Sequence, residues 1–150
     1  MSAVFSKMLS PFGGVLIVCF FLPWITVSCS NMPVIQNVSA LDLAQGVTVQ
    51  GQPSESAPEM YVIPIGGAVL GIAGLVLWGK KSAGASILAV LGAAAALAMT
   101  AMYYYTVEQR INSDPTAVSM INVEWEIGFW GALIAGAGGL FAGIFSFGDR

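Results

Sequence analysis

Four uncharged, mostly apolar stretches alternate with polar segments along the chain. They cover residues 12–29, 60–79, 83–105 and 127–147, and none of them contains Asp, Glu, Lys or Arg. An α-helix of about 20 such residues crosses the hydrocarbon core of a bilayer. The pattern therefore predicts an all-α membrane protein in which residues 1–150 form a single domain, a four-transmembrane-helix bundle.

Two polar segments, residues 30–59 and 106–126, leave the predicted bundle on the same side and are expected to form a small extracytoplasmic loop cap. In the first, "SALDLAQG" predicts a short helical turn, because Ser39 can cap it, Asp42 occupies the third helical position and Gly46 can take a left-handed stop. The following "VTVQ" alternates as a short strand does. This loop is too short to bury a core of its own.

The second outer segment is expected to begin as a continuation of the third helix beyond the bilayer. Asp114 and Pro115 then predict a new helical turn, with the cap first and the proline at the first helical position. The charged side chains of this segment are expected to be solvated, and the alternative is a docking surface for a periplasmic partner.

The charges outside the spans predict the orientation of the protein. Short cytoplasmic loops are enriched in Lys and Arg, so the side that carries more of them is predicted to be cytoplasmic. That side holds both termini, and the protein is predicted to be a multi-pass protein of the bacterial inner (plasma) membrane. Its basic residues are Lys7, Lys80, Lys81 and Arg150, whereas the opposite side has Arg110 alone. The acidic residues of the opposite side are Asp42, Glu55, Glu59, Glu108, Asp114, Glu124 and Glu126.

Aromatic residues near the span ends agree with this orientation. Trp and Tyr favour the interface between hydrocarbon and water, where one end of the ring system is apolar and the other is wet. At the inner interface the sequence predicts an anchor at Trp78. At the outer interface it predicts anchors at Trp24, Tyr61, Tyr103, Tyr104, Tyr105, Trp125 and Trp130.

The composition excludes several classes of function. With 57% hydrophobic and 9% charged residues, the chain is too apolar for an ordinary soluble domain. Five basic residues offer no stripe for the phosphates of a nucleic acid, and the chain has no histidine, the commonest general base and a common metal ligand. We therefore predict no catalytic residue, no cofactor and no metal site, and a protein that is not an enzyme.

Transport across a single bundle is also disfavoured. An ionisable residue at the centre of the bilayer usually marks an ion pathway, and no span contains one. Glu124 and Glu126 flank the outer end of the last span, but two residues apart on a helix they diverge, which argues against a paired-carboxylate centre.

Cys29 ends the first apolar stretch, in "FFLPWITVSCSN". The residues before it do not fit a cleavage site for a lipid anchor, so we expect an uncleaved first helix. On one continuous helix, Cys19 lies about 15 Å from Cys29 along the axis, too far for a disulfide. An intermolecular disulfide through Cys29 remains as the alternative to a plain helix end, in which Pro23 kinks or stops the helix and Trp24 anchors it.

The same stretch, followed by "SALDLAQG", resembles the first helix and outer loop of small bacterial four-span membrane proteins with an FLPW-x-x-VSC motif. The likeness covers about a quarter of the chain and implies no activity. The four-span layout, with Trp24 and Cys29 in the first outer segment, is also superficially similar to that of claudins. The outer loop lacks the second cysteine of the claudin pair, so the resemblance implies neither a disulfide nor a junctional role.

Small residues line one face of the last span at a spacing of four. Such faces let two membrane helices approach closely. Van der Waals packing then holds the helices together, because lipid provides no hydrophobic driving force for their association. The candidate helix-packing interface is formed by Gly67, Gly71, Gly131, Ala135, Gly139 and Gly143. One interpretation is that these faces meet within the bundle, and the other is that a surplus groove accepts another protomer or subunit.

From these features we predict a non-enzymatic structural or assembly subunit, either self-assembling or accessory to a larger membrane complex. Its expected contacts are membrane lipids and other copies of itself or other integral membrane subunits, with a periplasmic partner at the acidic outer face as a further candidate. The alternative is a channel or facilitator for small solutes or ions formed between protomers. Binding of lipid or pigment in the grooves is a third hypothesis.

Overall fold

The computed structural model describes residues 2–29, 32–46, 48–49, 52–53, 55–79, 82–113 and 121–146. Helices dominate it, and short strands occupy the polar segments between them. The helices are α1 (Ser2–Phe21), α2 (Ala40–Gln45), η1 (Pro58–Tyr61, a 3-10 helix), α3 (Val62–Gly79), α4 (Ala83–Ser113) and α6 (Ile127–Phe145). The strands are β1 (Pro23–Cys29), β2 (Met32–Ser39), β3 (Thr48–Val49), β4 (Gln52–Pro53) and β5 (Ile121–Trp125).

Three helical segments are long and apolar enough to cross a membrane: Pro58–Gly79, Ala83–Ser113 and Ile127–Phe145. They correspond to three of the four predicted spans. The apolar part of α1, Lys7–Phe21, is shorter than these three. The described part of the chain therefore has three membrane-spanning candidates, by length and composition, which indicates a membrane protein.

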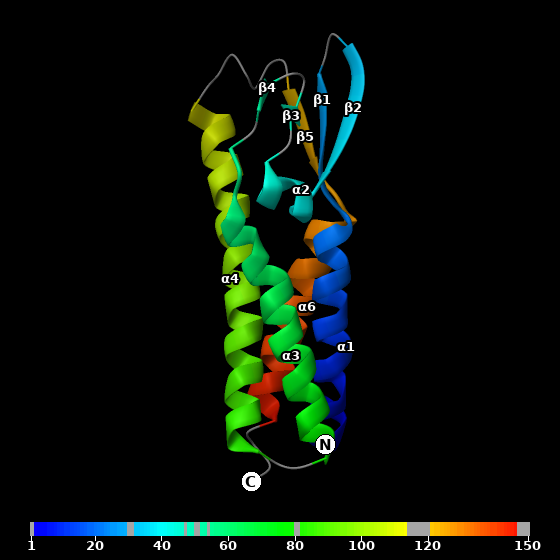
Figure 1. Cartoon of the computed structure of the whole chain (residues 1–150), viewed down its shortest axis with the longest axis vertical. Helices are drawn as coiled ribbons and strands as arrows, with labels where there is room; N and C mark the ends of the chain where they lie inside the picture. The colour runs from blue at the N-terminus through cyan, green and yellow to red at the C-terminus, as the bar shows by residue number, and fades with distance from the viewer. Residues whose placement is uncertain are drawn as a thin grey trace.

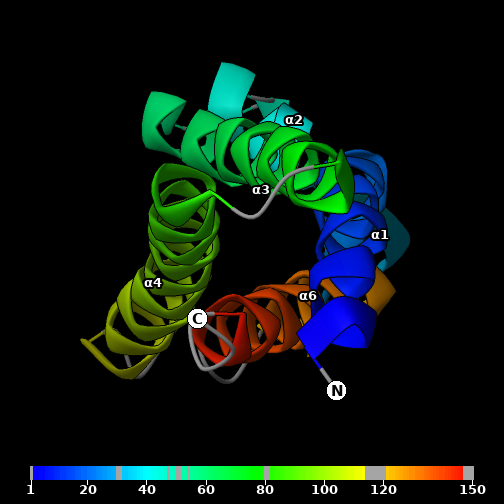
Figure 2. The ribbon, with the colours of Figure 1, turned by 90° about the horizontal axis from the view of Figure 1, so that it is seen from below.

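The long helices run side by side along the longest axis of the molecule (Figure 1). Seen along that axis they form a closed ring, in which α1 contacts α3, α3 contacts α4, α4 contacts α6, and α6 returns to α1 (Figure 2). Their shared core consists mainly of alanines and a few leucines, among them Leu16, Leu70 and Ala93, all with 0% exposure. The small residues allow the helices to lie close together, as in other membrane helix pairs.

A three-stranded antiparallel sheet in the order β2-β1-β5 stands at one end of the helices (Figure 1). The central strand β1 pairs with β2 through Thr26 and Asn37, and with β5 through Thr26 and Glu124. The sheet therefore joins the two polar segments that the sequence assigns to one side. The name cap is used below for this sheet together with α2, β3 and β4.

The predicted first span, residues 12–29, is wrong in its second part. Helix α1 ends at Phe21, and residues from Pro23 onwards form β1. Pro23 has no N–H to continue the helix, and it disfavours the helical conformation of Leu22. The β-branched run Ile25, Thr26 and Val27 then favours an extended backbone, which a hydropathy count does not distinguish from a helix.

The other boundaries differ less. Helix α6 ends two residues before the predicted limit at 147, and α3 begins at Val62 after the 3-10 turn η1. Helix α4 continues to Ser113, so the expected projection of this helix beyond residue 105 is confirmed. The described residues of the polar segments 30–59 and 106–126 include α2 and the strands β2, β3, β4 and β5.

The short helix in the first outer segment is confirmed as α2. Ser39 is its N-cap, and its hydroxyl accepts a hydrogen bond from the Asp42 backbone N–H, while the Asp42 carboxylate accepts one from the Ser39 N–H. Gly46 ends the helix with φ 78°, a backbone region that favours glycine. The strand predicted in "VTVQ" corresponds to β3, and the turn predicted at Asp114 and Pro115 lies outside the described residues.

Candidate functional site: the helix interfaces and the cap

Helix α1 approaches α3 closely at Gly13. A Cβ added at Gly13 would lie 2.5 Å from both the carbonyl oxygen of Gly67 and the backbone nitrogen of Gly71. Both obstacles are backbone atoms, which cannot rotate away. Two of the predicted interface residues, Gly67 and Gly71, therefore form a contact with α1 in which only glycine fits at position 13.

The small-residue face of α6 points into the ring of helices. A Cβ at Gly131 would lie 2.6 Å from the Sγ of Cys19 on α1, and one at Gly143 would lie 2.8 Å from Val90 on α4. Gly139 faces Leu70 of α3, whose Cδ2 would be 2.6 Å from the added carbon, and Ala135 is 2% exposed. Gly131, Gly139 and Gly143 therefore face other helices of the same chain, and the alternative of a surplus groove that accepts another protomer stays a prediction.

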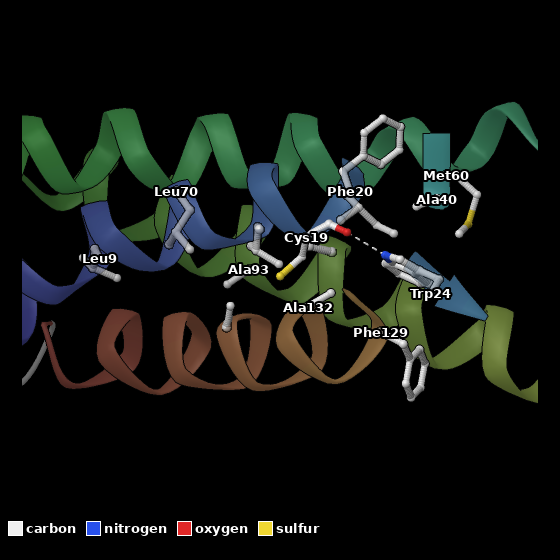
Figure 3. Close-up of a cluster of buried hydrophobic side chains, with 14 of the residues drawn as sticks. Leu9, Cys19, Phe20, Trp24, Ala40, Met60, Leu70, Ala93, Phe129 and Ala132 are labelled. Atoms are coloured by element: carbon white, nitrogen blue, oxygen red, sulfur yellow. Dashed lines mark hydrogen bonds between the residues drawn. The ribbon is translucent and has the colours of Figure 1, made fainter. Parts of the chain in front are cut away.

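Trp24 connects the end of α1 to the cap. Its indole Nε1 donates a 2.8 Å hydrogen bond to the carbonyl oxygen of Cys19 (Figure 3). In a continuing helix this carbonyl would accept from the N–H of the residue four positions later, which here is Pro23. The side chain of Trp24 therefore supplies the donor that the proline lacks, in a position that is shielded from water.

Trp24, which the sequence predicts to be an interfacial anchor, has a completely buried side chain. Its ring makes edge contacts with Phe129 and Tyr103, with centroids 5.8 and 6.2 Å away. Gly128, at the start of α6, lies against the same strand: a Cβ there would be 2.5 Å from the Pro23 carbonyl oxygen and 2.7 Å from the Trp24 ring. Trp24 thus belongs to a core shared by α1, β1, α4 and α6.

The sequence interpretation missed Gly13 and Gly128. Gly13 belongs to the pair Gly13-Gly14 inside an apolar stretch, which is a local signal that two backbones approach each other. Gly128 has no such signal, because its need for glycine arises from the chain crossing at Pro23, about 100 residues earlier. Only the tertiary contact identifies it.

Several other predicted anchors are exposed at the cap end of the helices. Tyr61, Tyr105 and Trp130 expose 39%, 62% and 50% of their surface. At the opposite end Trp78 exposes 56%. From Tyr61 to Trp78 the chain rises about 25 Å along the helix, close to the ~30 Å of hydrocarbon in a bilayer. These four side chains are exposed, and their role as interfacial anchors stays a prediction.

The remaining predicted anchors form a ring cluster with the buried Trp24. Tyr103 and Trp125 are only partly exposed, and their ring centroids lie 6.4 Å apart. Tyr104, with 38% exposure, contacts Trp125 at 5.1 Å and Phe129 at 5.8 Å. These three aromatic residues, together with Trp24 and Phe129, therefore hold the base of β5 against α4 and α6.

A hydrogen-bond network crosses the sheet on its polar face. The Oγ1 of Thr26 lies 2.7 Å from Oε1 of Glu126 and 2.9 Å from the side-chain amide of Asn37. The hydroxyl has a single proton, which Thr26 can donate either to the Glu126 carboxylate or to the Oδ1 of Asn37. The network links β1, β2 and the residue that precedes α6. On the same face, Asn122 donates to the exposed Glu124 at 3.3 Å.

The two cysteines have different surroundings. Cys19 is buried and carries a free thiol. Cys29 ends β1 and pairs through its backbone with Met32 and Ile121, so the two residues do not share one helix as the sequence interpretation assumed. The side chain of Cys29 lies outside the described residues, and the hypothesis of an intermolecular disulfide stays a prediction.

Two hydroxyls on α4 bond to carbonyl oxygens four residues earlier in the chain. The completely buried Thr100 donates to the carbonyl oxygen of Ala96 at 2.9 Å, and Ser86 donates to that of Ser82 at 3.4 Å. Within the described part of the chain, no group of three His, Cys, Asp or Glu residues is placed to hold a metal ion.

Comparison with protein-family models, with curated proteins and with solved structures gives no match to this chain.

Proposed function

We propose that this protein is a non-enzymatic, four-span structural or assembly subunit of the bacterial inner membrane, with both termini in the cytoplasm. It acts as an accessory subunit of a larger complex or assembles with further copies of itself. The cap, on the extracytoplasmic side, makes the contact with the partner. The small-residue face of α6, which the sequence analysis considered as an interface for a partner, packs instead against helices of the same chain.

The fourth span in this proposal is α1. This helix packs against α3 and α6 over the length of the ring, so it lies within the same slab as the three helices of spanning length (Figures 1 and 2). Its apolar part, Lys7–Phe21, rises about 21 Å, and tilt or local thinning of the bilayer accommodates a short span at modest cost. An even number of spans then places both ends of the chain on one side.

The observation that carries the assembly role is the rigid attachment of the cap to the helices through Trp24. A docking surface binds with less loss of conformational entropy when it is already ordered before the partner arrives. Strand β1 is tied to α1 by the Trp24 hydrogen bond, to α6 by the contact of Gly128 with Pro23, and to both β2 and β5 by pairing. The cap is thus held in one orientation above the membrane.

The partner is expected to be a protein with a basic surface. The polar face of the sheet exposes Asn37, Asn122 and Glu124, and partly exposes Glu126. Glu55 pairs with Arg110 at 3.6 Å, while both side chains stay exposed to water. Complementary charge steers association and fixes its orientation more than it adds affinity.

The alternative function, a pore formed between protomers, would need the small-residue face of α6 to be free to line the pore. The small face of α6 that would line such a pore contacts α1, α3 and α4 of its own chain. The hydroxyls of Ser86 and Thr100 bond to carbonyls of their own helix, so they do not mark a polar pathway.

Native mass spectrometry of the protein extracted from its native membrane in a mild detergent tests the proposal. Copies of this chain in fixed number, or other subunits in fixed ratio, are the expected result. Glu124→Lys on the sheet should remove the bound species, whereas Glu108→Lys, the same charge reversal on an exposed turn of α4, should retain it. A monomer throughout, or equal behaviour of the two variants, would contradict an assembly role of the cap.

A further inference from the structure

The outer edge of β5 carries backbone groups that form no hydrogen bond with the described part of the chain. Strand β5 pairs with β1 on one side and is the last strand of the sheet on the other. In antiparallel pairs every second residue directs its N–H and C=O to the neighbouring strand, and the residues between direct theirs away. The N–H of Glu126 donates to the carbonyl oxygen of Trp24, so in the same register Glu124 also faces β1. Val123 and Trp125 therefore direct their backbone groups to the outer edge.

The two edges of the sheet differ in how well they accept a further strand. Strand β2, at the other edge, contains Pro33, which has no N–H, and proline on an edge strand hinders pairing with another chain. Strand β5 has no proline, and the side chains of Asn122 and Glu124 on it are exposed. An exposed edge without proline is a template for an extended segment of another chain. The edge of β5 is therefore the better position for strand addition.

The side chains of β5 indicate the chemistry of the added segment. Glu124 and Asn122 lie on the polar face of the sheet, because Glu124 pairs with Thr26 and side chains alternate along a strand. Val123 and Trp125 lie on the opposite face and are half-buried. A strand beside β5 would place every second side chain near the Glu124 carboxylate and the others near Val123. Because opposite charges on neighbouring strands stabilise their pairing, the matching segment alternates basic and apolar residues.

A second copy of this chain fits the edge less well than a different protein. The strands of the sheet run along the longest axis of the molecule (Figure 1). Two copies in one membrane orientation, related by a two-fold axis along the membrane normal, would bring the polar face of one sheet beside the apolar face of the other. The two outer segments also contain a single basic residue, Arg110, which already pairs with Glu55. The positive charge that matches Glu124 must therefore come from another protein.

We propose that the outer edge of β5 binds an extended segment of a different protein as a fourth strand of the sheet, and that this segment alternates basic and apolar side chains. The backbone groups of Val123 and Trp125 bind the segment, and Glu124 selects its charge. The inference rests on the proposed assembly role of the cap, and it specifies how the partner is bound.

Two substitutions at Val123 separate backbone pairing from side-chain contact. Val123→Pro removes the outward N–H, and proline is tolerated on an edge strand where the N–H faces away from the sheet. The pairing of β5 with β1 should therefore persist in this variant. Val123→Ala shortens the side chain and keeps the N–H, so it is the matched control. Circular dichroism of both variants checks that each is folded.

The full-length protein in an uncharged detergent is mixed with a fluorescent synthetic peptide in which Lys and Val alternate, or with one in which Glu and Val alternate, and binding is followed by anisotropy. We expect the wild type and Val123→Ala to bind the Lys-Val peptide, and Val123→Pro to bind it about tenfold more weakly. The Glu-Val peptide should bind the wild type about tenfold more weakly than the Lys-Val peptide does. Bound Lys-Val peptide should also slow hydrogen exchange of the Val123 amide.

Equal binding of the Lys-Val peptide by the two Val123 variants, or no binding by the wild type, would overturn strand addition. Equal binding of the two peptides would overturn the selection of basic side chains. The assembly role is judged separately, by native mass spectrometry of the protein from its own membrane. A monomer there contradicts that role, whereas a partner that survives Val123→Pro contradicts only this mode of binding.

Discussion

The indole Nε1 of Trp24 donates to the carbonyl oxygen of Cys19 at 2.8 Å, five residues earlier in the chain. The last carbonyls of a helix have no partner within it, and Pro23 removes the donor that would have served this one. Trp24 completes the hydrogen bonding of α1 at the point where the chain turns from helix to strand. The same side chain fixes β1, and hence the cap, against the bundle.

Replacement of Trp24 by phenylalanine keeps an aromatic ring and removes the donor. The Cys19 carbonyl would then be buried without this partner, which costs about 1–3 kcal/mol. We expect the free energy of unfolding in detergent to fall by this amount. Trp78→Phe, at a 56% exposed position, is the matched control and should leave it unchanged. Equal values for the two variants would show that the hydrogen bond does not stabilise the fold.

Gly13 and Gly14 are neighbours with opposite surroundings. Gly13→Ala places a carbon 2.5 Å from backbone atoms of α3, so α1 and α3 must separate, and we expect a loss of about 1–3 kcal/mol of stability. Gly14→Ala meets open space and improves helix propensity by up to about 1 kcal/mol. In thermal unfolding followed by circular dichroism, the unfolding temperature of Gly13→Ala should therefore lie below that of the wild type, and that of Gly14→Ala should lie above it. The opposite order would contradict the packing of α1 on α3.

Gly139 tests whether the face of α6 is internal. Its added Cβ would meet the end of the Leu70 side chain, which can rotate, so Gly139→Ala should destabilise the protein less than Gly13→Ala does. Gly139→Leu, with a larger side chain, should unfold the monomer at lower temperature even at high dilution in detergent. If this variant changed only the oligomeric state and left the unfolding temperature of the monomer intact, α6 would present its small face to another molecule.

The proposed topology predicts which positions a membrane-impermeant thiol reagent reaches. In a Cys29→Ala background, Ser113→Cys at the end of α4 should be labelled in intact spheroplasts, whereas Gly79→Cys at the end of α3 should be labelled only after lysis. Both positions are exposed and Cys19 is buried, so labelling reports the side of the membrane. The reverse pattern would place the cap and the acidic residues in the cytoplasm.

The sequence predicted correctly the elements that are stabilised by interactions between residues close together in the chain. The capping box of α2 was predicted because Ser39 and Asp42 bond to each other's backbone within one turn. Three predicted spans correspond to helices of membrane-spanning length, because apolar length decides whether a helix is stable in hydrocarbon, although α4 continues beyond residue 105 to Ser113. The first span was misjudged at Pro23, because hydropathy does not distinguish a buried helix from a buried strand that pairs with β2 and β5.

By itself, the sequence determined that this is a membrane protein and which of its residues are small enough for close helix packing. Only the tertiary structure decided how these features are used. It showed that Gly139 and Gly143 face Leu70 and Val90 of the same chain, and that Trp24 is buried under the cap. The physical reason is that close approach and burial depend on residues from distant parts of the chain. The spacing of small residues along one helix does not determine which other helix packs against them.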